Sequence, residues 1–107
     1  MTLLAIDDIK QAINRAVSVA HAPRKAILFG SYARAQAHAA SDLDILLVED
    51  VVPDPVAEYS RVREAIGTVG TGVDILIYTA AEFERRKNWW SSPVYWAVRE
   101  GQVIYER

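Results

Sequence analysis

Two short groups of residues, Gly30-Ser31 and Asp42-Leu43-Asp44, are best suited to carry chemistry, and ten residues separate them. Alternate residues of a strand point to the same face of a sheet, so Asp42 and Asp44 are predicted to direct their carboxylates to one place. Two converging carboxylates repel each other unless a positive group lies between them. Mg²⁺ is a natural candidate, because this hard cation prefers oxygen ligands and often bridges carboxylates to nucleotide phosphates. The pattern therefore indicates phosphate chemistry.

A third aspartate, Asp74, begins an Asp-Ile-Leu sequence like the one that begins at Asp44. If the two strands are neighbours, Asp74 can join Asp42 and Asp44 around the same ions. Two metal ions about 3.5–4 Å apart could then hold an in-line displacement at phosphorus, with Asp42 and Asp44 bridging both ions and Asp74 on the acceptor side. The alternative is that all three belong to turns or an exposed strand edge. We favour the metal site because aspartate is depleted in strands, whereas two of these three precede strongly apolar runs.

Gly30 and Ser31 could bind the phosphate groups. Glycine lets the backbone approach phosphate oxygens closely, and a helix beginning just after it presents free N–H groups to an anion. The Ser31 hydroxyl would add one more donor. Arg34 follows one helical turn later and could contact the polyphosphate, although a solvated arginine is an almost equally good interpretation. A Gly-Ser pair alone is a common turn, so its significance comes from its place between two strands.

The composition is ordinary for a folded domain and excludes several other kinds of chemistry. The chain has 107 residues, of which 51% are hydrophobic and 24% charged, near the usual size for one domain. It contains no cysteine, so neither a disulfide nor a thiolate site is available. The net charge of -2 argues against a protein that coats nucleic acid. With no apolar run of membrane-spanning length and no secretion signal, we expect one cytoplasmic domain over residues 1–107, without membrane contact or direct nucleic-acid binding.

The hydrophobic pattern predicts alternating helices and strands, and thus an α/β or α+β fold with a small mixed sheet of about four strands flanked by helices. Asp54-Pro55, Thr79 to Glu82 and Ser92-Pro93 are typical of helix starts. The apolar face of the helix after Asp54 is predicted to contain Val56, Tyr59, Val62 and Ile66. The expected helices cover 1–20, 54–66, 79–88 and 92–100, with a short helical turn within 31–40, and the expected strands cover 25–29, 45–48, 73–78 and 102–105.

Trp89, Trp90, Tyr95 and Trp96 concentrate aromatic side chains in one short segment. We expect Tyr95 and Trp96 to pack in the core. Adjacent tryptophans at a helix end or in a loop are difficult to bury together, so one of Trp89 and Trp90 is expected to be exposed and to help dock a partner. Core packing of both is an equally good alternative.

The segment from Gly30 to Arg34, the ten-residue gap before Asp42, the aspartate at 44 and the later Asp74 resemble the minimal nucleotidyltransferases of the DNA polymerase beta superfamily. The likeness is greatest to the MNT antitoxins of bacterial and archaeal HEPN–MNT toxin–antitoxin pairs. It covers nearly the whole chain, including the closing sequence from 99 to 106. Many relatives have glycine where this chain has Ala35, which suggests a slightly stiffer loop.

This resemblance implies a polymerase-beta-like nucleotidyltransferase fold and a Mg-dependent protein adenylyltransferase. Such antitoxins bind ATP with Mg²⁺, transfer AMP to a tyrosine of a partner HEPN ribonuclease toxin, release pyrophosphate and thereby silence the toxin. A hetero-oligomer with that toxin is expected, and Mn²⁺ could replace either of the two Mg²⁺ ions. Carried over to this sequence, the implied metal ligands are Asp42, Asp44 and Asp74, and the implied phosphate-binding residues are Gly30 and Ser31.

Two alternatives stay open from the sequence. One is a catalytically idle antitoxin that neutralises its toxin by binding alone. The other is a nucleotidyltransferase that acts on a small-molecule or RNA hydroxyl with the help of a partner subunit, because relatives with such substrates usually carry an additional helical domain.

Overall fold

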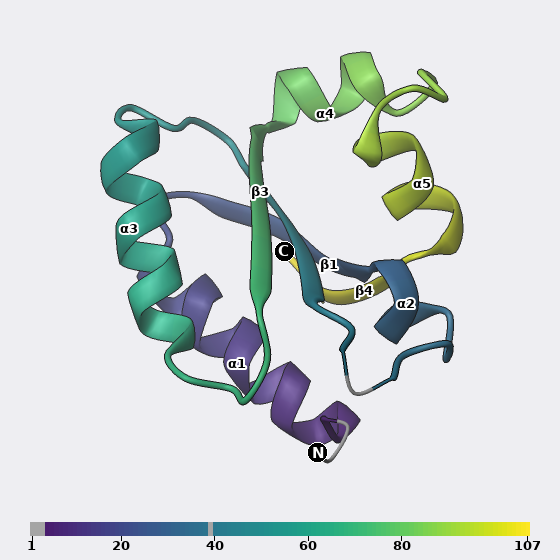
Figure 1. The fold of residues 1–107 in the computed structure, drawn as a ribbon. Coiled ribbons are helices and arrows are strands. Elements are labelled where there is room, and N and C mark those ends of the chain that lie inside the picture. Colours follow the sequence, from purple (N-terminus) through teal and green to yellow (C-terminus); the bar gives the residue numbers. More distant parts are fainter. Residues whose placement is uncertain (1–3, 39) are drawn as a thin grey trace.

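A four-stranded mixed sheet with the order β3-β2-β1-β4 forms the centre of the protein (Figure 1). The structure, a computed structural model, describes residues 4–38 and 40–107. β2 pairs in parallel with β3 and antiparallel with β1, which in turn pairs antiparallel with β4. The predicted mixed sheet is confirmed. Its strands are β1 (Pro23–Phe29), β2 (Leu43–Glu49), β3 (Val73–Thr79) and β4 (Gln102–Glu106).

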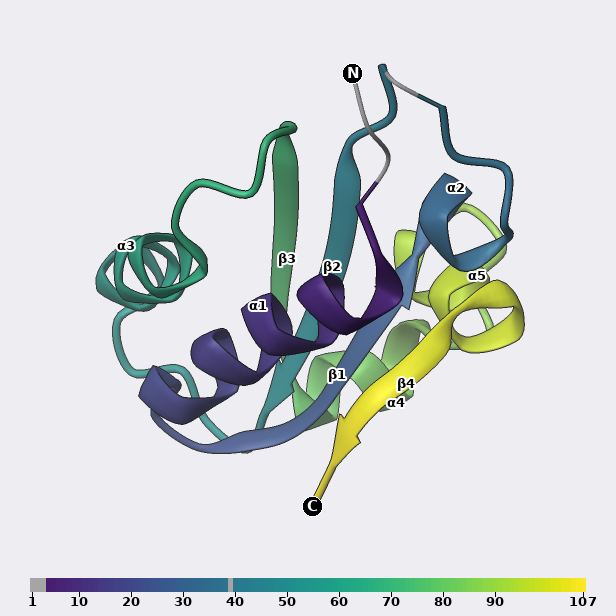
Figure 2. The same ribbon diagram turned by 90° about the horizontal axis from the view of Figure 1, so that it is seen from below.

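Helices cover both faces of this sheet. Figure 2 shows α1 and α3 on one side, with α4 and α5 on the other and α2 directly after β1. None of the helices in the described part of the chain has the length and apolar character that a membrane crossing requires. The helices are α1 (Ile6–Val19), α2 (Gly30–Ala33), α3 (Pro55–Ile66), α4 (Ala80–Arg86) and α5 (Pro93–Glu100).

The central strand β2 is buried on both faces, which explains its continuous apolar run. Ile45 and Leu47 pack in the core cluster beneath α1 and α3, whereas Leu46 and Val48 pack in the cluster beneath α4 and α5. A strand covered by helices on both faces has no need of polar alternation. The position of this strand in the middle of the sheet was predicted and is confirmed.

The three predicted helix starts are also confirmed, since each has a side-chain cap that accepts a hydrogen bond from a free N–H of the first turn. The helix predicted to run to residue 88 ends earlier, at Arg86, and turns connect it to α5. The caps are Asp54 Oδ1 with Ala57 N (3.1 Å), Thr79 Oγ1 with Glu82 N (3.1 Å) and Ser92 Oγ with Val94 N (3.2 Å).

The predicted buried face of α3 is wrong in part. Val62 and Ile66 are buried as expected, but Val56 is 78% exposed and Tyr59 is exposed as well. The helix instead turns Glu58 inward, where only 2% of the residue is exposed. Hydrophobic spacing misplaces this face because a charged residue is buried in it.

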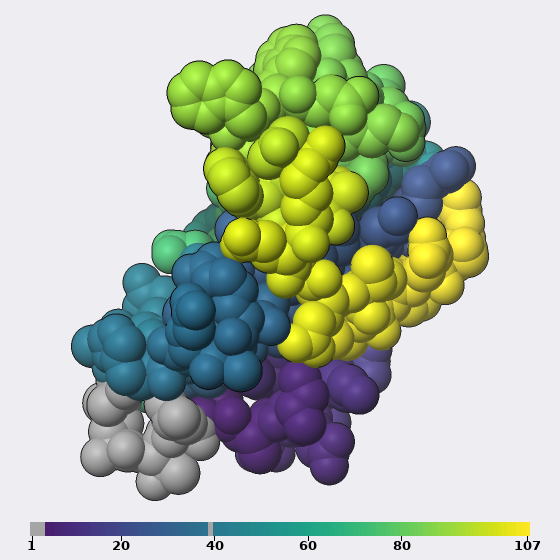
Figure 3. Space-filling view, turned by 90° about the vertical axis from the view of Figure 1, so that its right-hand side faces the viewer, coloured from purple at the N-terminus to yellow at the C-terminus, as the bar shows by residue number. Residues whose placement is uncertain are grey.

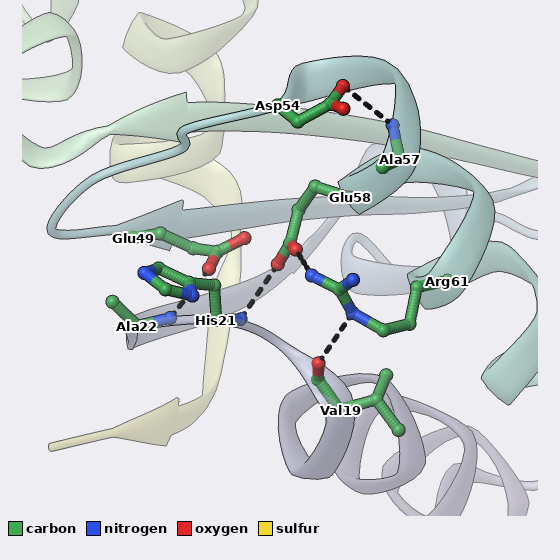
Figure 4. Close-up of polar contacts among 8 residues, drawn as sticks. All are labelled: Val19, His21, Ala22, Glu49, Asp54, Ala57, Glu58 and Arg61. Carbon is green, nitrogen blue, oxygen red and sulfur yellow. Dashed lines mark hydrogen bonds and ion pairs between the residues drawn. The ribbon is translucent and has the colours of Figure 1, made fainter.

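Glu58 is buried because polar groups of its own helix and of two other segments converge on it (Figure 4). It accepts a hydrogen bond from the backbone N–H of His21 at 2.9 Å and forms an ion pair with Arg61. Arg61 also donates to the carbonyl of Val19 at 3.0 Å. Glu49 of β2, which is 0% exposed, lies opposite and accepts from the backbone N–H of Ala22 at 2.9 Å.

Opposite shifts in pKa explain how the two carboxyl groups tolerate burial together. Burial raises the pKa of Glu49 to about 7, and its hydrogen bond to Glu58 adds to the effect. Burial alone would also raise the pKa of Glu58, but the hydrogen bonds from Glu49 and His21 and the charge of Arg61 hold it below its ordinary value. The raised pKa makes Glu49 the member of the pair that binds a proton more readily, and its Oε2, which has no hydrogen-bond partner among the described residues, is the oxygen left free for that proton.

Replacing Glu49 by glutamine is expected to remove most of the pH dependence that this pair creates. In the wild type, the stabilisation by protonated Glu49 is complete below its ordinary pKa of 4.5 and is lost as the pH rises through about 7. Between about pH 5 and about pH 8, the free energy of unfolding should therefore fall by roughly 2 kcal/mol more in the wild type than in Glu49→Gln. The lowered pKa of Glu58 acts only at more acidic pH.

Denaturant unfolding at a series of pH values measures this difference. Glu64→Gln, an exposed change on the same helix, is the matched control and should follow the wild-type curve. If the free energy of unfolding of the wild type and of Glu49→Gln changed with pH in the same way, the raised pKa of Glu49 would be contradicted.

Candidate active site

Asp44 and Asp74 lie side by side on neighbouring parallel strands. The register of β2 and β3 places Asp44 beside Asp74 and Ile45 beside Ile75. Asp42 precedes the first residue of β2. The condition under which Asp74 could join the other aspartates, that the two strands are neighbours, is therefore met, and both Asp-Ile-Leu sequences begin at the same end of the sheet.

Both carboxylates lie on the face of the sheet that carries α4 and α5. Leu43 and Ile45, on either side of Asp44, belong to the core beneath α1 and α3, as does Ile75 next to Asp74. Successive strand residues point to opposite faces, so the aspartates point away from that core. Asp74 is exposed to solvent and Asp44 is partly buried.

Asp74 and Asp42 are close enough to change the ionisation of Asp44. Burial raises the pKa of Asp44 to about 6, and the charge of Asp74, its hydrogen bond and the charge of Asp42 add to this effect. The positive charge of Arg34 lowers the pKa of Asp44, but this effect is smaller than the combined rise. The site therefore contains an excess of negative charge.

Gly30 brings the Gly-Ser pair directly against this charge. Its φ of 74° lies in the left-handed region that favours glycine. A side chain at position 30 would also collide with the carboxylate of Asp44. Ser31 follows as the second residue of α2. Among the residues that the structure describes, its hydroxyl has no hydrogen-bond partner. The sheet thus places the predicted phosphate-binding pair next to the predicted metal ligands.

Arg34 lies at the end of α2 and makes polar contacts with two other side chains. Its guanidinium lies 3.4 Å from a carboxylate oxygen of Glu100 in α5 and donates to the Gln36 side chain at 3.1 Å. Because this ion pair is largely exposed, it contributes little stability and can be exchanged for another anion. A contact with polyphosphate stays a prediction.

The chemistry of the site fits a hard divalent cation. Its side-chain donors are carboxylate oxygens, and within the described ranges none of Asp42, Asp44 and Asp74 forms an ion pair. In the same ranges, no three acidic, histidine or cysteine side chains are already gathered into a metal-binding cluster. A cation that binds here would therefore draw these carboxylates closer together. Its positive charge would offset their mutual repulsion.

The aromatic segment between α4 and α5 projects from the surface, as the light-green part of Figure 3 shows. Both Trp89 and Trp90 are exposed, Trp90 by 73%. The expectation that Trp96 packs in the core is wrong, because 47% of it is exposed. Val94 and Ala97 provide the buried side of α5, which turns Trp96 outward, where its indole N–H donates to the carbonyl of Trp90 at 2.9 Å. A docking role for this segment stays a prediction.

Gly72 is a residue of the site that was not predicted from the sequence. A side chain at this position would collide with the carboxylate of Asp42. The available signal was its position in the sequence: Gly72 precedes Asp74 by the same number of residues as Asp42 precedes Asp44.

The sequence and the fold are similar to those of known nucleotidyltransferases. The family model described as Polymerase beta, Nucleotidyltransferase matches residues 10–107. A protein of Methanocaldococcus jannaschii, named as a proposed protein adenylyltransferase, is 34% identical over 82 residues, which are 77% of this chain and 78% of the relative.

Two solved structures share the fold at lower sequence identity. A chain of a toxin–antitoxin crystal structure with AMP-PNP aligns with a TM-score of 0.68 and 20% identity, covering 97% of this chain and 75% of the other. A chain from the complex of the tri-AMPylated Shewanella oneidensis HEPN toxin with its MNT antitoxin aligns with a TM-score of 0.59 and 17% identity, covering 95% and 71%. Taken with the family match and the juxtaposed aspartates, these findings show that the chain belongs to the polymerase beta nucleotidyltransferase family.

Proposed function

We propose that this protein transfers AMP from ATP to a tyrosine of a partner HEPN toxin and thereby neutralises the toxin. The observation that carries the proposal is the pairing of Asp44 with Asp74 on neighbouring strands, with Gly30 against the first of them. In this proposal the paired aspartates serve as the cation site, with the Gly-Ser pair beside them as the phosphate-binding group. The name of the archaeal relative supports a protein acceptor, and the toxin–antitoxin complexes with the same fold support a toxin as that acceptor.

Asp42, Asp44 and Asp74 are the residues that would hold two Mg²⁺ or Mn²⁺ ions. When bound, such ions neutralise charge that develops at phosphorus and lower the pKa of an attacking hydroxyl. Gly30 lets the backbone lie directly against the Asp44 carboxylate, where a side chain would collide with it, and the Ser31 hydroxyl is available to donate to a phosphate group.

Asp74 is suited to the acceptor side because it is exposed on β3, at the margin of the sheet. In the proposed reaction, the tyrosine oxygen forms a bond to the α-phosphorus of ATP. The bond from that phosphorus to the bridging oxygen breaks, and pyrophosphate leaves with the electron pair. Asp74 accepts the hydroxyl proton, so the products are the AMP-tyrosine ester, pyrophosphate and a protonated carboxyl group.

Divalent cations are expected to stabilise the wild type, because they relieve the repulsion among the aspartates and bind only the folded state. At about 100 times its dissociation constant, a cation would add about 2.7 kcal/mol. Asp44→Asn should melt at a higher temperature than the wild type without metal, since one of the repelling charges is gone, and Mg²⁺ should raise its melting temperature little.

Differential scanning calorimetry with and without Mg²⁺ or Mn²⁺ tests this expectation. Asp7→Asn, an exposed change in α1, is the control and should respond to metal like the wild type. A wild-type melting temperature that neither cation shifts, with or without ATP, would contradict the cation site.

The transfer itself is tested with the product of the neighbouring gene as acceptor. After incubation with ATP and Mg²⁺, mass spectrometry should find the mass of AMP on a tyrosine of the partner. Asp44→Asn should lower the rate at least about 100-fold, while Asp7→Asn should retain it.

Each alternative function has its own signature in this experiment. Neutralisation of the toxin by Asp44→Asn, without an adduct, would support an antitoxin that acts by binding alone. An adduct on an RNA end or a small hydroxyl compound, but not on the partner, would move the acceptor to another class.

A further inference from the structure

Gly72 lies beside Asp42 just before the point where β3 begins. The parallel register pairs Leu43 with Val73, and the backbone N–H of Leu43 donates to the Gly72 carbonyl at 2.9 Å. One residue earlier on each segment, Asp42 and Gly72 are therefore neighbours. The two segments therefore stay side by side before β2 and β3 begin, where Asp42 lies.

The backbone at Gly72 does not require glycine. The glycines with positive φ are Gly30, Gly67 and Gly70, and Gly72 is not among them. Any L-residue could adopt its backbone conformation. The reason for glycine at this position must therefore lie in the space around it.

That space is occupied by the carboxylate of Asp42. The nearest atoms to a side chain at position 72 are the Oδ1, Cγ and Oδ2 atoms of Asp42, and the first of these would collide with it. In the same way, a side chain at position 30 would collide with the carboxylate of Asp44. Two of the three aspartates are thus seated against glycines that come from neighbouring segments.

The segment before Asp42 is held in the same way. Thr71 donates from its hydroxyl to the Ser41 carbonyl at 2.7 Å. The hydroxyl of Ser41, a buried residue, accepts from the backbone N–H of His38 at 2.9 Å. Because these bonds fix the backbone on both sides of the contact, an added side chain at position 72 would be accommodated by turning the Asp42 carboxylate away from its place.

We propose that Gly72 is a positioning residue of the active site, whose missing side chain leaves the space in which the Asp42 carboxylate is held for cation binding. This inference rests on the proposed function, because it assumes that Asp42 binds a divalent cation. Gly72 itself touches neither substrate nor cation. It acts only through the position of the Asp42 carboxylate.

Mn²⁺ binding, followed by the electron paramagnetic resonance signal of the free ion, tests the proposal without relying on activity. Gly72→Ala should weaken Mn²⁺ binding about 10-fold or more, the effect usual for residues that orient a metal ligand. Gly70→Ala is the matched control in the same loop. It strains a backbone with a φ of 90° but meets no atom within 4 Å, so it should lower stability and leave Mn²⁺ affinity unchanged.

A double-mutant cycle shows whether the effect passes through Asp42. In the Asp42→Ala background, adding Gly72→Ala should change Mn²⁺ affinity less than about twofold, because the colliding carboxylate is gone. If Gly72→Ala alone fails to fold by far-ultraviolet circular dichroism, the double variant should fold, since it lacks the collision.

Wild-type affinity in Gly72→Ala, an equal loss in the Asp42→Ala background or an unfolded double variant would each overturn the positioning role. If the wild type binds Mn²⁺, these results leave the proposed function intact. A wild type that does not bind Mn²⁺ would remove the cation site of the proposed function and the role of Gly72 together.

Discussion

The repulsion between Asp44 and Asp74 is the constraint on which the site depends, and the pairing of β2 with β3 enforces it. In a parallel pair, residues in register keep their side chains side by side along the whole strand. Moving the two carboxylates apart would require a shift of register, which would exchange the apolar residues of β2 between the two cores and disrupt the packing of both. The burial of Leu46 and Leu47 thus holds two charges together that would separate if they were free.

The protein contains a second pair of close carboxyl groups, and the contrast explains why the aspartates are suited to a cation. Glu49 and Glu58 are buried and surrounded by donors, namely two backbone N–H groups and the guanidinium of Arg61, and burial raises the pKa of Glu49 so that it binds a proton more readily. Asp44 lies beside Asp74, which is exposed, so a hydrated ion can enter there. Within the described residues, Asp42, Asp44 and Asp74 form no ion pairs. The same like-charge repulsion is thus relieved by a proton in the core and can be relieved by a metal ion at the surface.

Local patterns predicted most of the fold, because caps, strand lengths and glycines act within a few residues of the chain. The repeated Asp-Ile-Leu sequence indicated that Asp74 could join Asp44 if their strands were neighbours, and the pairing of β2 with β3 meets that condition. The predictions failed where a distant contact outweighed the local pattern. Glu58 rotates α3 because it meets Glu49 from β2, and Trp96 turns outward because Val94 and Ala97 complete the core. Neither contact leaves a periodic signal in the sequence.

The order of strands also gives the site two different sides. Asp44 is on the central strand, with Gly30 at the end of antiparallel β1 on one side and Asp74 on parallel β3 on the other. The Gly30 side is narrow, because even a methyl group there would meet the carboxylate, whereas the Asp74 side opens to solvent. A tyrosine carried by a folded partner needs the open side. This asymmetry follows from placing β3 at the margin of the sheet, and it favours the proposed assignment of Asp74 to the acceptor over the reverse.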